Sequence, residues 1–305
     1  MTEIEKLRRE DIDAITAISD ECFKKNFHIT KERIISNLFE TNDYAPEASF
    51  VIKNNGRVIG FIGTKISNCE AVYPDTAWIS IFAVLNDEQN KGYGTQLMKK
   101  ALEVLKGKGI KQVFIGMDFN NFFSGIPDPQ EKKKEFFKEL GFELGDHLHF
   151  DMEADVSVNA KMDTFDPTPF EGKYSVTPFV DEYQGLLDFL EAEFPGRWKY
   201  EAEVAYEEKK PKEDMLLLKE KATGKILGFC FLHGLGRIYG GLGPIGIAKE
   251  TRGSHVGNFI LWNGLMQLRK LGVHEVNIDW TTLEKFYGQF GFVPERYFLA
   301  ALKKL

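Results

Sequence analysis

The sequence is poor in several features that would point to particular classes of protein. Three cysteines, Cys22, Cys69 and Cys230, stand far apart among 305 residues, and no two of them form a C-x-x-C pair. Such sparse cysteines are typical of reduced thiols in a cytosolic protein. No apolar run approaches the ~20 residues of a membrane span, and the charged opening "MTEIEKLRRED" lacks the apolar core of a signal peptide. We therefore expect a cytoplasmic protein without a membrane partner.

Basic charge is scarce as well. The chain has 39 Lys and Arg against 46 Asp and Glu, a formal net charge of −7, and contains no long basic run. Because a nucleic-acid surface needs clustered Lys and Arg, no nucleic-acid partner is expected. His147 and His149 alternate on a predicted strand and share a face, but a metal site would need a third ligand and none is indicated. We expect no metal.

What the sequence does contain is a repeat. "NGRVIGF" (55–61) matches "TGKILGF" (223–229) at a lag of 168 residues, and "QNKGYGTQLM" matches "RGSHVGNFIL" at a lag of 163. "EFFKELGF" then matches "KFYGQFGF" at a lag of 150, because the first copy carries an insertion within "FNNFFSGIPDPQEKKK". Matches in the same order indicate one structural unit used twice.

Each copy alternates strand and helix patterns, which predicts an α/β fold. In the first copy a hairpin turns at "NNG", a strand covers 77–84, and a helix over about 93–107 places five apolar side chains on one face: Leu97, Met98, Ala101, Leu102 and Leu105. Pro167 and Pro169 mark a polar connector. We predict domains at 1–160 and 172–305 with a connector at 161–171, each domain a twisted mixed β-sheet flanked by helices.

The loop "QNKGYG" joins a strand to a helix through two glycines, Gly92 and Gly94. A helix N-terminus exposes unpaired N–H groups, and glycine removes the Cβ atoms that would hold an anion away from them. Such a loop is suited to bind a pyrophosphate. Alternatively, the two glycines only permit a sharp corner between strand and helix.

The order strand, [Q/R]-x-x-G-x-G, amphipathic helix, strand and "F-[F/Y]-x-x-[L/F]-G-F" resembles the GNAT superfamily of acyl-CoA-dependent N-acetyltransferases. Both copies carry it, as "AVLNDEQNKGYGTQLMKKAL" with "FFKELGF" and as "IGIAKETRGSHVGNFIL" with "FYGQFGF". The resemblance implies two tandem GNAT-like domains that use acetyl-CoA to acetylate the amine of a small molecule. GNAT units commonly pair, so the chain is expected to be a monomer or a homodimer.

The resemblance also implies which residues bind coenzyme A. Pantetheine would lie along the strand end at Phe82, Ala83 and Val84, where a backbone N–H would polarise the thioester carbonyl. The pyrophosphate would rest on seven consecutive residues, namely Gln89, Asn90, Lys91, Gly92, Tyr93, Gly94 and Thr95. An Asn beyond the next strand often contacts the cofactor in this family, which makes Asn120 and Asn121 candidates.

The catalytic residues are divided between the copies. Many family members use a Tyr at the "FY" position as an acid, and here the first copy has Phe137 whereas the second has Tyr287. The second copy instead has His255 in place of the first loop glycine, which would crowd a phosphate. Asp118, at a strand end, is a candidate general base or a turn-capping carboxylate.

We weight the intact loop more heavily and assign acetyl-CoA to the N-terminal domain. Two alternatives stay open. Catalysis could lie in the C-terminal domain with Tyr287 as the acid, or the protein could be a non-catalytic module that binds acyl-CoA.

Overall fold

The computed structural model describes residues 2–23, 25–207, 214–233 and 239–305. The chain divides into two compact units, which we call the N-terminal unit (1–149 and 296–305) and the C-terminal unit (150–295). Each has its own buried apolar cluster. The compact units do not follow the predicted boundaries at 160 and 172, because the last ten residues of the chain join the N-terminal unit while residues 150–160 join the C-terminal one.

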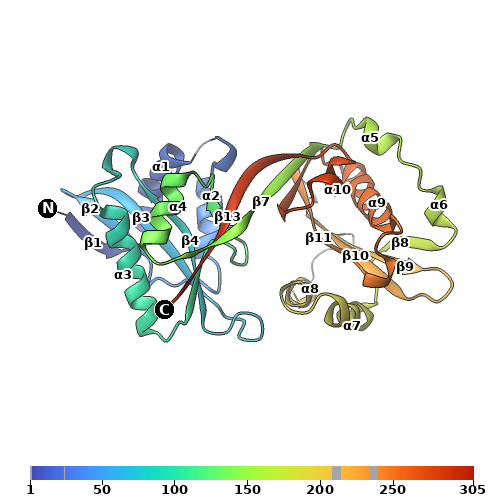
Figure 1. Ribbon diagram of the computed structural model, residues 1–305, viewed down its shortest axis with the longest axis horizontal. Coiled ribbons are helices and arrows are strands. Elements are labelled where there is room, and N and C mark those ends of the chain that lie inside the picture. The colour runs from blue at the N-terminus through green and yellow to red at the C-terminus, as the bar shows by residue number, and fades with distance from the viewer. Residues whose placement is uncertain (1, 24, 208–213, 234–238) are drawn as a thin grey trace. The chain divides into compact units, whose positions relative to one another are not determined.

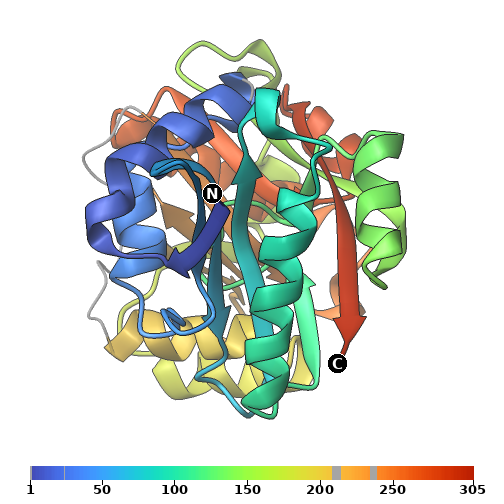
Figure 2. The same cartoon turned by 90° about the vertical axis from the view of Figure 1, so that its left-hand side faces the viewer.

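The N-terminal unit is an α/β sheet whose strands run in the order β1-β2-β3-β4-β5-β13. Its elements from the first part of the chain are β1 (Thr2–Lys6), α1 (Ile12–Cys22), α2 (Lys31–Ile34), β2 (Phe50–Asn54), β3 (Arg57–Ile66), β4 (Thr76–Val84), α3 (Tyr93–Gly107), β5 (Gln112–Ile115), β6 (Ile126–Pro127), α4 (Glu131–Glu139) and β7 (Glu143–Asp155). A π-helix, η3 (Ile35–Phe39), extends α2. Seen end-on, α1 and α2 lie on one face of this sheet and α3 and α4 on the other (Figure 2).

The hairpin β2–β3 turns as predicted at "NNG". Asn54 pairs with Arg57, and the two residues between them, Asn55 and Gly56, both have positive φ angles of 49° and 80°. Such a pair matches the right-handed twist of the flanking strands, which is why Asn-Gly is favoured there.

The helix α3 is amphipathic as predicted. Its five buried side chains are those expected from the 3.6-residue period: Leu97, Met98, Ala101, Leu102 and Leu105. Because they lie on one stripe, the helix packs on β2, β3 and β4 while its Lys and Glu residues face solvent.

The C-terminal unit repeats the arrangement with the strand order β7-β12-β11-β10-β9-β8. Its elements are α5 (Ala160–Asp163), α6 (Thr168–Glu171), β8 (Tyr174–Pro178), α7 (Tyr183–Glu193), α8 (Arg197–Glu207), β9 (Met215–Glu220), β10 (Ile226–His233), β11 (Tyr239–Ile247), α9 (Val256–Lys270), β12 (Glu275–Thr281) and α10 (Glu284–Gly288). The last strand, β13 (Val293–Lys304), begins in this unit, and its residues from Arg296 onward belong to the N-terminal unit. In Figure 1, α9 and α10 cover one side of these strands, and α7 and α8 the other. The two-domain α/β fold is confirmed.

The final strand of each copy of the repeat pairs with a strand of the other copy. The end of β7 pairs antiparallel with β12, from Glu275 opposite Asp155 to Ile278 opposite Met152. The end of β13 pairs antiparallel with β5, from Leu302 opposite Phe114 to Lys304 opposite Gln112. Sequence reasoning did not predict β13, although "RYFLAAL" has the apolar content of a half-buried strand.

Candidate active site

The candidate site lies where β4 and β5 separate. These strands pair in parallel from Thr76 opposite Gln112 to Ile79 opposite Ile115, after which β5 ends while β4 continues to Val84. The pairing of β4 with β3 shifts register at Ser80, where a bulge lies between Ile79 and Ile81. Bulges re-aim strands and are frequent beside active sites.

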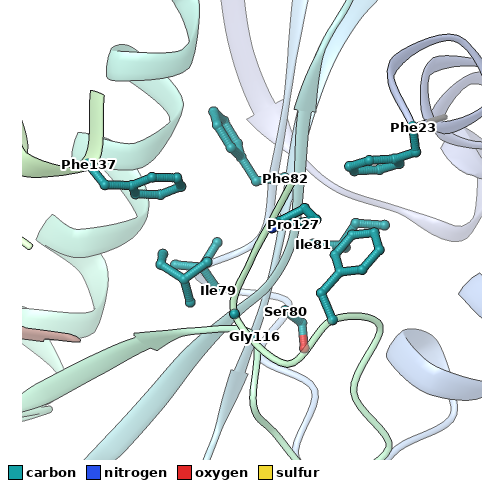
Figure 3. Close-up of a pocket in the computed structure, with 11 residues that line it drawn as sticks. Phe23, Ile79, Ser80, Ile81, Phe82, Gly116, Pro127 and Phe137 are labelled. Atoms are coloured by element: carbon teal, nitrogen blue, oxygen red, sulfur yellow. The ribbon is translucent and has the colours of Figure 1, made fainter. Parts of the chain in front are cut away.

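A pocket opens at this separation (Figure 3). Phe23, beyond α1, and Phe137, on α4, approach it from opposite sides of β4. Its lining is almost entirely apolar, with one hydroxyl: Phe23, Ile79, Ser80, Ile81, Phe82, Ile115, Gly116, Phe123, Gly125, Pro127 and Phe137. Such a lining excludes water and suits an uncharged chain or acyl group.

Of the three predicted strand-end residues, Phe82 lines the pocket, whereas Ala83 and Val84 are buried beside it in β4. The carbonyl of Val84 accepts hydrogen bonds from Gln89 Nε2 (3.0 Å) and from Cys22 Sγ (3.2 Å). Burial raises the pKa of the Cys22 thiol to about 11. All three cysteines are unpaired.

The glycine loop follows β4 directly. Asn90 and Gly92 adopt left-handed backbone angles with φ of 63° and 82°, and Gly92 is the N-cap of α3. A Cβ built on Gly92 would meet nothing nearer than Gln96 Nε2 at 4.0 Å, so the space above it is open. The left-handed backbone angle at position 92 favours glycine, and the missing side chain leaves that space free.

Gly94 has a different role. A Cβ there would lie 3.1 Å from the ring of Phe82 and 3.5 Å from that of Phe136. These two rings stack with centroids 5.8 Å apart. Gly94 therefore allows the first turn of α3 to pack on the aromatic pair. This supports, for Gly94, the alternative that the glycine serves the packing of the corner between strand and helix.

The loop presents a row of free backbone donors. Within the described chain, no backbone N–H from Gln89 to Thr95 donates to another group, and the first donor of the helix is Gln96 N–H, to Gly92 O at 3.1 Å. The residues from Gln89 to Gly92 are exposed, while Tyr93, Gly94 and Thr95 are half-buried. Unpaired donors at the positive end of a 15-residue helix dipole form an anion-binding corner.

Two side chains of the loop, Gln89 and Lys91, form hydrogen bonds with neighbouring residues that hold the loop in place. Gln89 Nε2 also bonds Asn86 Oδ1 at 3.1 Å, which fixes the loop against the strand end. Lys91 Nζ lies 2.9 Å from Glu88 Oε2, and this hydrogen bond raises the pKa of the ammonium. Lys91 thus stays charged, at the edge of the corner.

Asp118 is fully buried and contacts Ser80, which lines the pocket. Its carboxylate accepts from Lys65 Nζ and from Ser80 Oγ, each at 2.5 Å, and Lys65 also donates to Phe119 O at 2.8 Å. This arrangement ties the β4 bulge to the end of β5 and favours a structural role over that of a general base. Sequence reasoning missed Lys65 and Ser80, although a Lys in the apolar strand "VIGFIGTKI" was a signal for a buried charge.

Asn120 and Asn121 do not line the pocket. Their carbonyls accept from Asn37 Nδ2 at 2.9 Å and from Arg33 at 3.1 Å, so they anchor the insertion to the α2 region. Instead, the insertion reaches the pocket through Phe123, Gly125 and Pro127.

Tyr287 is buried in the core of the C-terminal unit, with 5% of its surface exposed. Burial raises the pKa of its phenol above the ordinary value, and the hydroxyl bonds the side chain of Thr281. A proton donor for catalysis must reach the substrate, and this one is enclosed by packing. Its counterpart Phe137 does line the pocket of the N-terminal unit.

The second loop has the same shape but fewer free donors. His255 takes the place of Gly92 with nearly the same backbone angles, φ 62° and ψ 6° against φ 82° and ψ 0°. Three of its backbone N–H groups donate within the loop: Arg252 to Lys249 O, Ser254 to Thr251 O and Asn258 to His255 O. The anion-binding corner is therefore more complete in the N-terminal unit.

The described residues contain neither a candidate metal site nor a candidate membrane-spanning helix. No group of three His, Cys, Asp or Glu side chains there is placed to hold a metal ion. None of the helices described is both long and apolar enough to cross a membrane.

Comparison with known proteins finds similarity to acetyltransferases. Residues 12–142 match the model of the family described as "Acetyltransferase (GNAT) family". N-alpha-acetyltransferase 30 of Schizosaccharomyces pombe is 27% identical over 100 residues, which cover 32% of this chain and 58% of that protein.

Two solved structures share the fold over the length of the chain. One is a GCN5-related glucosamine N-acetyltransferase region of a fungal multi-domain GH3 β-N-acetylglucosaminidase, with a TM-score of 0.86 at 22% identity over 99% of this chain and 38% of that one. The other is a tandem GNAT protein from the clavulanic acid biosynthesis pathway, with a TM-score of 0.67 at 17% identity over 100% of this chain and 98% of that one. The chain spans less than two thirds of the curated relative and of the fungal protein.

Proposed function

We propose that this chain, which matches the GNAT acetyltransferase family over residues 12–142, is an acetyl-CoA-dependent N-acetyltransferase whose N-terminal unit holds the cofactor. The observation that carries the proposal is the row of free N–H groups from Gln89 to Thr95, placed directly after the strand that lines the pocket. A diphosphate on these donors would leave the attached chain beside Phe82, where the pocket begins.

The residues present fit coenzyme A. The open space over Gly92 leaves room for a phosphate, and each charge-assisted hydrogen bond there is worth about 1.5–3 kcal/mol. We assign the pyrophosphate to Gln89, Asn90, Lys91, Gly92, Tyr93, Gly94 and Thr95, and the pantetheine to the strand end at Phe82, Ala83 and Val84.

When bound, acetyl-CoA supplies an activated acetyl group, which the amine of the acceptor attacks directly. The chain's own contribution is to bind and orient the reactants and to exclude water through the apolar lining of the pocket. The β4 bulge, held by Ser80 and Asp118, would fix the strand end against which the acyl group is proposed to lie.

Proton transfer is not assigned to Asp118 or Tyr287. The carboxylate of Asp118 is engaged by Lys65 and Ser80, and Tyr287 is enclosed in the other unit. Since Phe137 has no hydroxyl, the departing thiolate would take its proton from solvent, at a cost of about 10²–10⁴-fold in rate.

The proposed acceptor is the amine of a small molecule. The names of the two acetyltransferases above suggest two test classes, an amino sugar and a peptide α-amine, beside polyamines, amino acids and aminoglycosides. Release of the coenzyme A thiol in the presence of each amine would identify the class.

Calorimetric titration of the intact protein with acetyl-CoA tests the proposal. We expect one site per chain, and an affinity at least about 100-fold lower in Gly92→Glu, because its carboxylate repels the phosphates and a non-glycine residue is strained at this φ. His255→Glu, at the equivalent position of the second loop, is the matched control and should bind as the wild type. Absence of binding by the wild-type protein would refute the proposal.

Two other outcomes have a distinct meaning. If binding is tight but neither transfer nor slow hydrolysis of acetyl-CoA occurs with any amine, the protein is a non-catalytic module that binds acyl-CoA. If Tyr287→Phe abolishes turnover while Gly92→Glu does not, catalysis lies in the C-terminal unit.

A further inference from the structure

The last ten residues of the chain, Arg296–Leu305, form part of the N-terminal unit. Within it, β13 pairs with β5, one of the two strands that separate to form the pocket. The same strand pairs with the short β6 through Phe298 opposite Pro127 and Leu299 opposite Ile126. Asp128 N–H adds a hydrogen bond to Tyr297 O at 3.0 Å.

The segment that β13 holds in this way is the pocket loop, which we define as residues 116–130 between β5 and α4. Four of its residues line the pocket: Gly116, Phe123, Gly125 and Pro127. The pocket wall on this side is thus built on a strand from the far end of the sequence.

Phe298 is the side chain through which the strand meets the loop. It is completely buried, and its ring centroid lies 6.3 Å from that of Phe123, 5.7 Å from that of Phe27 and 5.9 Å from the imidazole of His149. His149 Nε2 in turn contacts Ser124 O in the loop. Phe298 itself is not among the residues that line the pocket.

The backbones of the strand and the loop also approach closely. A Cβ on Gly125 would lie 2.6 Å from Leu299 O, so no side chain fits between them. The first part of the loop is held differently, since Asn120 O and Asn121 O accept bonds from Asn37 and Arg33. Only the part from Phe123 to Asp128 depends on β13.

We propose that the C-terminal strand is a positioning element of the acetyl-CoA site and that Phe298 is its positioning residue. Without Phe298, the part of the loop from Phe123 to Asp128 loses its support and the pocket wall opens. The consequence for acetyl-CoA rests on the proposed function, whereas the support of the loop rests on geometry alone.

Hydrogen exchange of the full-length protein tests the support of the loop without any ligand. In Phe298→Ala, the amides of Ile126 and Asp128 should exchange at least about tenfold faster, while those of β2 and β3 keep their wild-type rates. Phe298→Leu should restore most of the protection. Lys304→Ala changes an exposed side chain of the same strand and is the matched control, expected to be without effect.

Calorimetry with acetyl-CoA then tests the consequence. We expect Phe298→Ala to bind about tenfold more weakly, since the anion-binding corner is intact but the pocket wall is not. Should Phe298→Ala fail to fold, Gly125→Ala separates the same two segments from the loop side and should show the same local exchange.

The outcomes separate the two proposals. Unchanged exchange at Ile126 and Asp128, or an equal increase throughout the unit, would overturn the role of Phe298. Failure of the wild-type protein to bind acetyl-CoA would overturn the proposed function and leave the result on the loop standing.

Discussion

The two glycine loops of this protein have the same backbone shape and different numbers of free backbone N–H donors. Gly92 and His255 both take left-handed angles at the N-cap of a 15-residue helix, and Asn90 and Gly253 precede them with φ of 63° and 80°. In the second loop, however, three N–H groups are consumed by internal hydrogen bonds. The two copies therefore share the shape of the corner but differ in the number of backbone N–H groups that are free to bind an anion.

The two units also differ in their buried charged residues. In the N-terminal unit Lys65 and Asp118 form a fully buried ion pair under the β4 bulge. At the same lags of the repeat, the second copy has His233 and Thr281. The N-terminal unit therefore has a buried ion pair at the two positions that His233 and Thr281 occupy in the C-terminal unit.

The largest effect should come from breaking that pair. Lys65→Met leaves Asp118 charged and buried without its cation, which typically costs about 3–5 kcal/mol of unfolding free energy. Hydrogen exchange of β3 and β4 amides at rising denaturant would measure it. Asp43, whose Oδ1 lies 3.8 Å from Lys65 Nζ, also loses its cation, so the double variant Lys65→Met with Asp118→Leu should recover only part of the loss. Thr281→Val in the other unit should cost far less. A loss below about 1 kcal/mol in Lys65→Met would show that the pair is not a structural requirement.

A smaller effect is expected from giving the first loop the residue of the second. Gly92→His keeps the left-handed corner but fills the open space with a ring, and we expect acetyl-CoA to bind about tenfold more weakly by calorimetry. The reciprocal His255→Gly should not create a second site, because the donors of Arg252, Ser254 and Asn258 remain consumed. A stoichiometry of two in His255→Gly would show that the side chain alone distinguishes the loops.

Removing the support of the first loop should have a milder result. Gln89→Ala deletes the bonds to Val84 O and Asn86 Oδ1, which hold the loop against the strand end, so acetyl-CoA affinity should fall by about fivefold, about 1 kcal/mol. Arg252→Ala is the matched change in the second loop and should leave binding unaltered. A loss of 100-fold or more in Gln89→Ala, about 2.7 kcal/mol, would mean that this side chain contacts the ligand itself.

The smallest effect is expected at Tyr287. Because its hydroxyl is enclosed and bonds Thr281, Tyr287→Phe should leave turnover within about twofold of the wild type, measured as thiol release once an acceptor is known. Loss of turnover in this variant would shift catalysis to the C-terminal unit.

Much of this protein could be predicted from its sequence. The repeat, the hairpin at Asn55 and Gly56 and the apolar face of α3 were expected and are confirmed, and the expected resemblance to the GNAT family is found over residues 12–142. Each rests on local periodicity or turn chemistry, or on a motif of adjacent residues, and such signals act over a few turns of chain.

The site was only partly predictable. The assignment of the strand end and the loop as the cofactor site remains a prediction, to which the structure adds the pocket and the free donors. The roles of Asp118, Asn120 and Asn121 depend on Lys65, Asn37 and Arg33, which lie some 50 to 90 residues away in the sequence. No pattern in a single sequence reveals which distant partner will neutralise a buried carboxylate or donate a hydrogen bond to a backbone carbonyl.

The sequence by itself determined the two copies, the hairpin at Asn55 and Gly56, the helix α3, and a corner at residue 92 that only glycine or a strained residue can form. Tertiary structure alone decided that the final strand of the chain completes the N-terminal sheet and carries the pocket wall. The physical reason is that strand pairing joins backbones regardless of their distance along the chain. An apolar run such as "RYFLAAL" specifies that it must be buried in a sheet, but not in which one.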